Sequence, residues 1–294
     1  MQVEVFDERV CALGEGPSAV GVRNSEVAWV DITGSRVLSR NMLTGESDEF
    51  PTGEPVGFAI PRATGGFVLG TDSGPILRDS DGSIHPFLKL SEIEPLTSQM
   101  AIRWNDAKVS PKGNLWLGTM GVEMLKGTSA LFKYDVKNST VSRVMPNLTI
   151  SNGMDWSDDG STFYFIDSDW QEVRAFTVID DEISDERTVI QIAESDGAPD
   201  GMCMDASGGI WVALWGGSQV RRYDSTNNFK LDHVIDLPAP FVTSCAFAGE
   251  KLDTLIITSA TDDKVDGPAE AGMTFHIKPG VTGRPSRKFD LQIS

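Results

Sequence analysis

Carboxylate and amide side chains recur in this sequence at the heads of similar short segments. Glu15 lies between two glycines, Asn152 and Asp200 each precede a glycine, and Asn105 lies within an Arg-Trp-Asn-Asp segment. Carboxylate and amide oxygens are ligands that hard divalent cations such as Ca²⁺, Mg²⁺ and Mn²⁺ prefer. One Asn-Gly or Asp-Gly pair is most simply a tight turn, but four such groups in register predict a metal site.

A second pattern follows each of these segments. A turn containing Gly or Asp and then a compact apolar strand recurs at residues 26–31, 65–70, 113–118, 160–165, 208–213 and 253–258. The spacing of roughly 40–50 residues equals the length of one four-stranded propeller blade. The sequence therefore predicts an all-β fold, a six-bladed β-propeller that forms one domain over residues 1–294. A pair of β-sandwiches is the alternative, which the near-regular repeats disfavour.

The segment before each apolar strand should form the first strand of its blade and line the central axis. The repeat-equivalent positions carry Glu15, Gly57, Asn105, Asn152, Asp200, and Thr243 or Ser244. Because equivalent positions of a propeller converge at one mouth of the axis, two carboxylates and two amides should meet there. We also hypothesise that the apolar start around residues 3–5 completes the last blade and closes the ring.

The charge balance excludes several kinds of partner. The 294 residues include 43 Asp+Glu and 25 Lys+Arg, a formal net charge of −18. Such a surface repels phosphate backbones and anionic lipid, so nucleic acid and membranes are excluded as partners. The sequence contains no run of 18 apolar residues, and its start lacks the basic and apolar regions of a signal peptide. The expected location is the cytoplasm.

Cysteine and histidine are too few and too scattered for several common sites. The three cysteines form no Cys-x-x-Cys pair, which excludes zinc ribbons and thioredoxin-type redox sites. His85, His233 and His276 all lie outside the six repeat heads. A Ser-His-Asp triad or a histidine-rich zinc site would therefore lack its base or its ligands. The histidines are expected to be structural or exposed.

The repeat heads and their neighbours resemble the senescence-marker-protein/gluconolactonase family, which includes regucalcin and bacterial sugar-lactone hydrolases. The resemblance keeps its order over residues 11–277. The shared phrases are Leu-Gly-Glu-Gly-Pro at 13–17, Arg-Trp-Asn-Asp-Ala-Lys-Val at 103–109, Gly-Thr-Met at 118–120, Ser-Asn-Gly at 151–153, Pro-Asp-Gly at 199–201 and Ala-Leu-Trp-Gly-Gly at 213–217. The resemblance implies a six-bladed propeller with one divalent cation in the central channel.

Residue by residue, the resemblance implies that Glu15, Asn152 and Asp200 are metal ligands. This is the set to which the repeat positions also point. Ca²⁺ is the favoured cation, with Mg²⁺, Mn²⁺, Zn²⁺ and Fe²⁺ as alternatives. Oxygen ligands alone do not choose among such ions, because availability and geometry also matter.

The resemblance also implies a substrate-binding set. Arg103 and Asn105 match substrate-contacting positions, and Glu123 occupies a further position that contacts sugar hydroxyls in some family members. The surrounding Val-Glu-Met departs from the family pattern. Residues 121–129 are a candidate lid, with an ordinary blade connection as the alternative. Trp104 or Trp215 would supply an apolar wall, although Trp104 fits blade packing equally well.

These expectations combine into one predicted reaction. The protein is predicted to be a lactonase that uses a divalent cation to hydrolyse an aldono-1,4- or 1,5-lactone to the aldonic acid. Asp200 would be the general base, and the partner would be a small-molecule sugar lactone. An esterase or organophosphate-type hydrolase, and a non-catalytic calcium-binding regulatory protein, are the alternatives. The sugar, the ring size and the oligomeric state are left open.

Overall fold

Antiparallel strands joined by tight turns make up most of the regular structure. The computed structural model describes residues 2–88, 93, 101–262 and 267–291. Short 3-10 helices interrupt the strands at η1 (Val22–Asn24), η2 (Ser168–Trp170), η3 (Glu194–Asp196) and η4 (Ser225–Asn227). Within these ranges, no helix combines the length and the apolar character needed to cross a bilayer.

Four repeats each form a separate four-stranded antiparallel sheet, with the strands in sequence order. The first sheet contains β2 (Gly14–Val20), β3 (Glu26–Asp31), β4 (Arg36–Asn41) and β5 (Ser47–Pro51); the second contains β6 (Val56–Pro61), β7 (Phe67–Thr71), β8 (Gly74–Arg78) and β9 (Ile84–Pro86). The third contains β10 (Ile102–Val109), β11 (Leu115–Gly121), β12 (Ser129–Asp135) and β13 (Thr140–Leu148); the fourth contains β14 (Ser151–Trp156), β15 (Thr162–Asp167), β16 (Glu172–Ile179) and β17 (Glu182–Gln191).

The remaining strands belong to one eight-stranded sheet. It contains β18 (Ala198–Met204), β19 (Gly209–Trp215), β20 (Gln219–Asp224), β21 (Lys230–Asp236), β22 (Phe241–Ala248), β23 (Thr254–Ala260), β24 (Thr274–Ile277) and the N-terminal β1 (Glu4–Asp7). The hypothesis that the N-terminal segment joins the last repeat is confirmed, since β1 pairs antiparallel with β24 through Val5 and Phe275.

The prediction of a six-bladed β-propeller is wrong. The described strands form five sheets, because β19 and β22 pair at Trp215 and Phe241 and so merge the fifth and sixth repeats. The rings of these two residues pack with centroids 4.7 Å apart, which holds the two strand ends together. The fold is all-β and propeller-like, with four four-stranded sheets and one eight-stranded sheet among the described residues.

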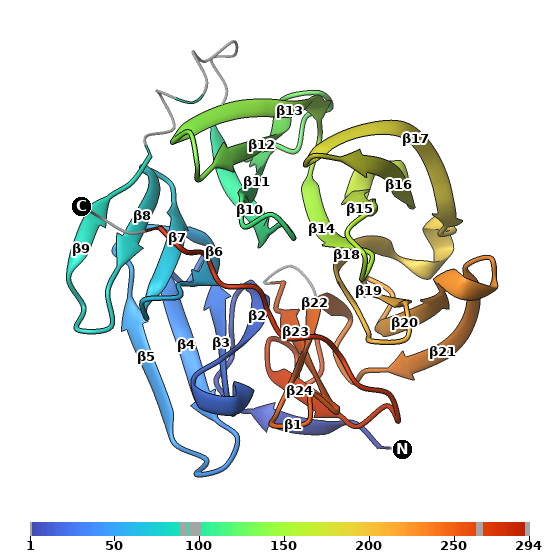
Figure 1. Cartoon of the computed structure of the whole chain (residues 1–294). Helices are drawn as coiled ribbons and strands as arrows, with labels where there is room; N and C mark the ends of the chain where they lie inside the picture. Colours follow the sequence, from blue (N-terminus) through green and yellow to red (C-terminus); the bar gives the residue numbers. More distant parts are fainter. Residues whose placement is uncertain (1, 89–92, 94–100, 263–266, 292–294) are drawn as a thin grey trace.

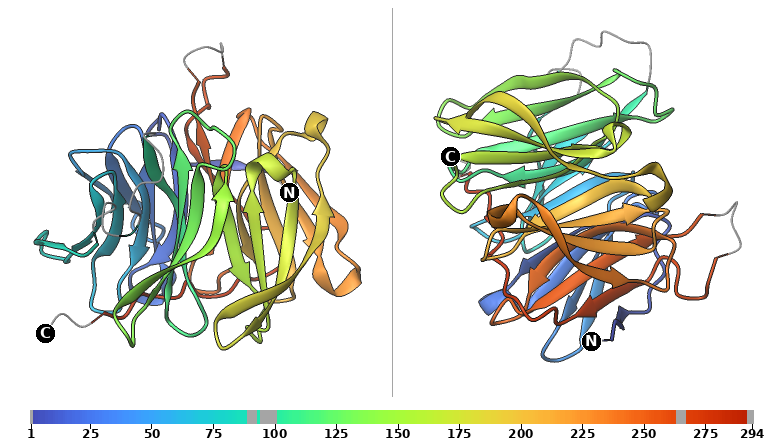
Figure 2. Two further views of the ribbon diagram at one scale, coloured as in Figure 1. Left: turned by 90° about the horizontal axis from the view of Figure 1, so that it is seen from above. Right: turned by 90° about the vertical axis from the view of Figure 1, so that its right-hand side faces the viewer.

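The six first strands surround a common axis. Each of β2, β6, β10, β14, β18 and β22 contacts the first strand of the next repeat, and β22 contacts β2. Figure 1 shows this closed ring in the view along the axis, and Figure 2 shows it from two sides. The six apolar phrases form the second strands, among which Trp29, Trp116 and Trp211 are fully buried. Hydrophobic packing between neighbouring sheets therefore holds the ring around its axis.

A buried carboxylate after β18 supports the eight-stranded sheet. Asp205 accepts hydrogen bonds from the Trp211 indole nitrogen at 2.9 Å, the Arg222 Nε at 2.6 Å and the Gly209 amide at 2.8 Å. Burial alone would raise the pKa of Asp205, but Arg222 and the Gly209 amide more than offset it and lower that pKa below its ordinary value of 3.8.

Replacing Asp205 with asparagine is expected to lower the free energy of unfolding by about 3 kcal/mol, because it leaves Arg222 without its buried partner. The ionised Asp205 stabilises the native fold fully at pH values above its ordinary pKa of 3.8. This stabilisation disappears as the pH falls through the lowered pKa of Asp205 in the folded protein, so the difference between the native protein and the variant should shrink at acidic pH. Urea unfolding at pH 7 and at acidic pH measures both effects. Asp236→Asn, at an exposed carboxylate of β21, is the control; equal stability of the two variants at pH 7 would contradict the prediction.

Candidate functional site

An interruption of pairing occurs near the head of each first strand. The register shifts between Glu15 and Ser18 in β2, between Trp104 and Ala107 in β10, between Ser151 and Met154 in β14, and between Pro199 and Met202 in β18. Such bulges re-aim side chains and are frequent beside functional sites. Glu15, Asn105, Asn152 and Asp200 all lie at these interruptions, so the same local irregularity positions all four.

Gly153 lets two of these strands approach closely. A Cβ atom at this position would lie 2.7 Å from the carbonyl oxygen of Asp200, closer than real side chains allow. The missing side chain permits this backbone contact between β14 and β18. The Asn-Gly sequence therefore has a packing reason besides turn formation, because it brings Asn152 next to the strand that carries Asp200.

Hydrogen bonds connect the amides of two repeats. The Asn105 Nδ2 donates to the Asn152 Oδ1 at 3.2 Å and to the Ser151 carbonyl oxygen at 2.9 Å. Arg103 Nη1 donates to the Asn105 Oδ1 at 2.8 Å, and the Asn152 Nδ2 donates to the Ser168 Oγ at 3.0 Å. These bonds fix the orientation of both amides and tie Arg103 to the same cluster.

The two carboxylates of the cluster are buried and close enough to influence one another. The Glu15 and Asp200 residues are 8 % and 6 % exposed. Burial raises the pKa of Glu15, and the Asp200 carboxylate raises it further. Burial also raises the pKa of Asp200, to which the Asp106 carboxylate adds. Burying like charges together is unfavourable, so this arrangement calls for a compensating positive charge.

Arg103 supplies only part of that charge. Burial lowers the pKa of its guanidinium, while attraction to Glu15, Asp72 and Asp200 opposes the change. The Asp200 Oδ1 is buried and has no hydrogen-bond partner within the described part of the chain. An unpartnered carboxylate oxygen beside a second buried carboxylate fits a divalent cation held by oxygen ligands.

The cation would need an amide among its ligands. In the described ranges, no three Asp, Glu, His or Cys side chains gather closely enough to hold a metal ion by themselves. Glu15 and Asp200 with the neighbouring Asn152 give two carboxylates and one amide, a donor set suited to Ca²⁺ or Mg²⁺. The three residues therefore fit a divalent cation.

Other candidates lie apart from this cluster. Glu123 is exposed in the connection between β11 and β12. Trp104 is 1 % exposed and packs against Phe58 and Phe132, so it belongs to the core and forms no wall of the site. Thr243 is the exception: it is buried, and its hydroxyl donates to the carbonyl oxygen of Gly14, the residue before Glu15, at 2.5 Å and contacts the Thr258 hydroxyl at 2.8 Å. The three histidines lie on β9, β21 and β24, which are third or fourth strands of their repeats.

Three further polar residues at the cluster were not predicted as site residues. Ser168 holds Asn152, Asp72 lies close enough to Arg103 to affect its pKa, and burial raises the pKa of Asp106 to about 6. A sequence signal exists for two of them. In an antiparallel pair the end of the second strand lies opposite the start of the first, as Thr71 does opposite Val56. Polar residues just after a second strand, such as Asp72 and Ser168, therefore reach the same mouth.

The chain matches the family model described as the SMP-30/Gluconolactonase/LRE-like region over residues 13–261. It is 32 % identical to regucalcin of Danio rerio, with 97 % of each chain covered. It is 31 % identical to the pentonolactonase XacC of Haloferax volcanii, with 96 % of each chain covered.

Among solved structures, the calcium-binding protein regucalcin of Agrobacterium tumefaciens superposes with a TM-score of 0.88 at 26 % identity. That match covers 98 % of this chain and 97 % of the other. The match to the family model spans most of the sequence and includes the heads of all six repeats. The chain therefore belongs to the SMP-30/gluconolactonase/LRE-like family.

Proposed function

We propose that this protein is a lactonase that hydrolyses a sugar lactone to the aldonic acid with the help of a divalent cation. The observation that carries the proposal is the buried pair of carboxylates, Glu15 and Asp200, in which the Asp200 Oδ1 has no hydrogen-bond partner among the described residues. Next to this pair, Arg103 is hydrogen-bonded to Asn105. The names of two relatives, a pentonolactonase and a calcium-binding protein, support the reaction class and the cation.

Glu15, Asn152 and Asp200 would hold the cation. When bound, a divalent cation supplies Lewis-acid polarisation of the lactone carbonyl and stabilises the negative charge that develops on its oxygen. The protein must supply the rest: it binds the lactone, excludes water and provides a group that accepts a proton.

Asp200 is the proposed general base. The water oxygen forms a bond to the lactone carbonyl carbon while its proton passes to the Asp200 carboxylate. The bond between that carbon and the ring oxygen then breaks, and the proton passes from Asp200 to the ring oxygen. A hydroxyl and a carboxylic acid result, so no further reactant is consumed.

Arg103 and Asn105 form the proposed substrate-orienting pair. The planar guanidinium can present two parallel donors to a carbonyl or hydroxyl oxygen, and its bond to the Asn105 Oδ1 fixes its direction. Glu123 remains a proposed contact for sugar hydroxyls. Its loop carries exposed Val122, Met124 and Leu125, and Lys126 pairs with Asp169 at 2.9 Å, which supports residues 121–129 as a proposed lid.

A pH-indicator assay on a panel of 1,4- and 1,5-aldonolactones tests the proposed function. The panel should include pentonolactones and hexonolactones, with aryl esters for comparison, and each should be measured with Ca²⁺, Mg²⁺, Mn²⁺ or a chelator. Cation-dependent turnover of lactones in preference to aryl esters is the expected result. Tight cation binding without turnover of any lactone would overturn the proposal and favour a non-catalytic calcium-binding role.

Replacing Arg103 with glutamine is expected to lower kcat/KM for the preferred lactone by about 10- to 100-fold, because a hydrogen bond from a charged group contributes about 1.5–3 kcal/mol. Most of the loss should appear in KM if Arg103 binds the ground state and the transition state equally. Steady-state kinetics measures both constants. Arg221→Gln, which removes a guanidinium paired with Asp196 on the fifth repeat, should leave both unchanged.

A further inference from the structure

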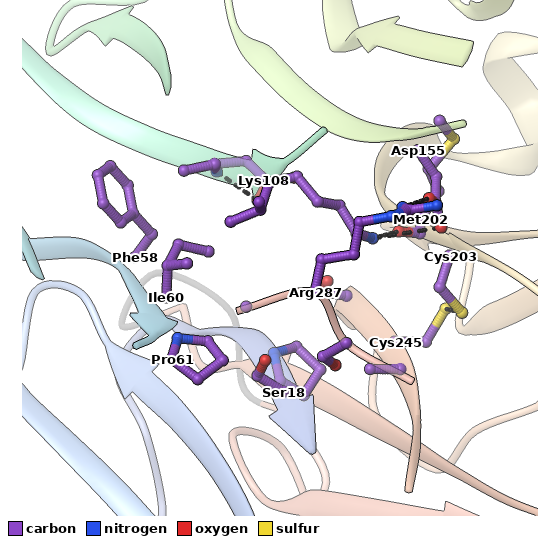
Figure 3. A pocket seen from close by; sticks show the side chains of 18 of the residues that line it. Ser18, Phe58, Ile60, Pro61, Lys108, Asp155, Met202, Cys203, Cys245 and Arg287 are labelled. Atoms are coloured by element: carbon purple, nitrogen blue, oxygen red, sulfur yellow. Dashed lines mark hydrogen bonds and ion pairs between the residues drawn. The ribbon is translucent and has the colours of Figure 1, made fainter. Parts of the chain in front are cut away.

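A second polar cavity lies farther along the same first strands. Lys108 follows Asn105 by three positions in β10, and Asp155 follows Asn152 by three positions in β14. Together with Ser18 of β2 and the C-terminal residues Arg284 and Arg287, they line a cavity of about 90 Å³. The lining includes neither Glu15 nor Asp200, although Asp106 borders both the cavity and the cluster around those two carboxylates. Figure 3 shows Lys108 and Arg287 extending toward Asp155 within it.

Three cations in this cavity surround a single neighbouring carboxylate. Lys108 Nζ lies 3.5 Å from Asp155, Arg284 Nη2 lies 3.4 Å from it, and Arg287 Nη1 lies 3.8 Å from it. These distances exceed the 2.7–2.9 Å or so of a strong charge-assisted hydrogen bond. Asp155 already accepts hydrogen bonds from the backbone amides of Trp156 at 2.8 Å and Met204 at 3.0 Å. Besides this carboxylate, Lys108 Nζ donates to the Met202 carbonyl oxygen at 3.4 Å and Arg284 Nη2 donates to the Trp156 carbonyl oxygen at 2.7 Å. One carboxylate thus satisfies the three cations only in part.

Arg284 retains an unused donor. The Arg284 Nη1 is buried without a hydrogen-bond partner, and the Asp158 carboxylate lies 3.9 Å from it. Within the described ranges, Asp155 is the one ion-pair partner of Arg287. The charged side chains that line the cavity are these three cations and two carboxylates, Asp155 and Asp106, so the lining carries an excess of one positive charge. This excess is notable in a chain whose formal net charge is −18.

The segment that carries both arginines is anchored on each side of them. Ala206 donates a backbone hydrogen bond to Thr282 at 2.8 Å, and Gly283 donates one to Leu252 at 2.7 Å. At the other end, Phe289 is fully buried and its amide donates to Pro61 at 2.8 Å. In Figure 1 the segment crosses the centre of the ring toward β6. Its two guanidinium groups are therefore preorganised before any ligand arrives.

We propose that this cavity binds a small oxyanion between Lys108, Arg284 and Arg287. The ligand chemistry is that of a tetrahedral dianion such as sulfate or phosphate, or of a small carboxylate, because guanidinium groups bind both through paired donors. The cavity exceeds the roughly 10–15 Å³ that one water needs and is far below the several hundred Å³ of typical organic-ligand pockets. Binding would connect the C-terminal segment to β10 and stabilise the fold.

Isothermal titration of the full chain with sodium sulfate tests the proposal, with sodium chloride at equal ionic strength as the reference. Saturable sulfate binding is expected in the native protein and in Lys288→Gln, which removes an exposed charge beside Arg287. Arg287→Gln should weaken the binding by about tenfold or more. Absence of saturable binding, or equal affinity of the two variants, would overturn the proposal.

Two further measurements separate this cavity from the catalytic cluster and from folding effects. Sulfate binding should persist in Asp200→Asn, and its disappearance there would assign the anion to the other site and overturn the proposal. Selenate soaked into crystals of the unmodified protein should give an anomalous peak among Lys108, Arg284 and Arg287; a missing peak would overturn it even if Arg287→Gln fails to fold. Titration with acetate distinguishes the two kinds of ligand. Tighter binding of acetate than of sulfate would indicate a small carboxylate, and tighter binding of sulfate would indicate a tetrahedral dianion.

Discussion

Replacing Asp200 with asparagine is expected to lower kcat for lactone hydrolysis by about 100- to 10,000-fold, the range typical of losing a positioned general base. The amide keeps the size of the carboxylate but accepts no proton from water at neutral pH. It also weakens the proposed cation site by removing one of its two buried carboxylates. Initial rates at saturating lactone and saturating Ca²⁺ measure the effect, and circular dichroism checks that the fold is retained.

Asp196→Asn is the matched control for this experiment. Asp196 lies four positions before Asp200, and its carboxylate pairs at 2.7 Å with Arg221 on the fifth repeat. Surface ion pairs of this kind contribute little to stability, so the control should keep both its activity and its fold. Full lactonase activity in a folded Asp200→Asn protein would contradict the role assigned to Asp200.

Removing the cation is expected to abolish lactone hydrolysis and to lower thermal stability. Adding a cation at 1,000 times its dissociation constant should raise the free energy of unfolding by about 4 kcal/mol, because only the folded chain holds Glu15 and Asp200 together. Activity and melting temperature should both return when a divalent cation replaces the chelator. Unchanged activity in the presence of excess chelator would rule out the proposed cation dependence.

Glu15→Gln should distinguish the destabilisation caused by burying two carboxylates together from their contribution to binding the cation. Without cation, this variant is expected to be about 1 kcal/mol more stable than the native chain, because it removes the repulsion between Glu15 and Asp200. When the cation is added, the stability and the lactonase activity of this variant should rise much less than those of the native protein. Glu250→Gln, at an exposed residue paired with Arg23, should behave like the native protein in both states. A metal-free Glu15→Gln protein that is less stable than the native chain would contradict the proposed repulsion.

The repeats could be predicted because each leaves a local pattern. Apolar and β-branched residues bounded by turn residues identified all six second strands, and the apolar N-terminal segment indicated the pairing of β1 with β24. The number of sheets could not be predicted in this way. It depends on one contact between Trp215 and Phe241, and nothing in either residue's local sequence indicates that the two strand ends pair.

The candidate site also contains residues that the sequence predicted and residues that it did not. Position within the repeat was enough to predict Glu15, Asn105, Asn152 and Asp200 as neighbours, because equivalent positions of a closed ring face one axis. Applied to the first strands alone, this reasoning missed Asp72, which directly follows the second strand β7 and lies near Arg103 of the next repeat.

The sequence by itself determined the all-β class, the repeat period and the residue types that can hold a hard cation, because these follow from local patterns and side-chain chemistry. The tertiary structure alone decided which oxygen is left unpartnered and where charges accumulate. Asp200 Oδ1 and Arg284 Nη1 are ordinary polar atoms in the sequence. Burial away from water makes their missing partners costly, and the ring with its crossing C-terminal segment decides which atoms are buried.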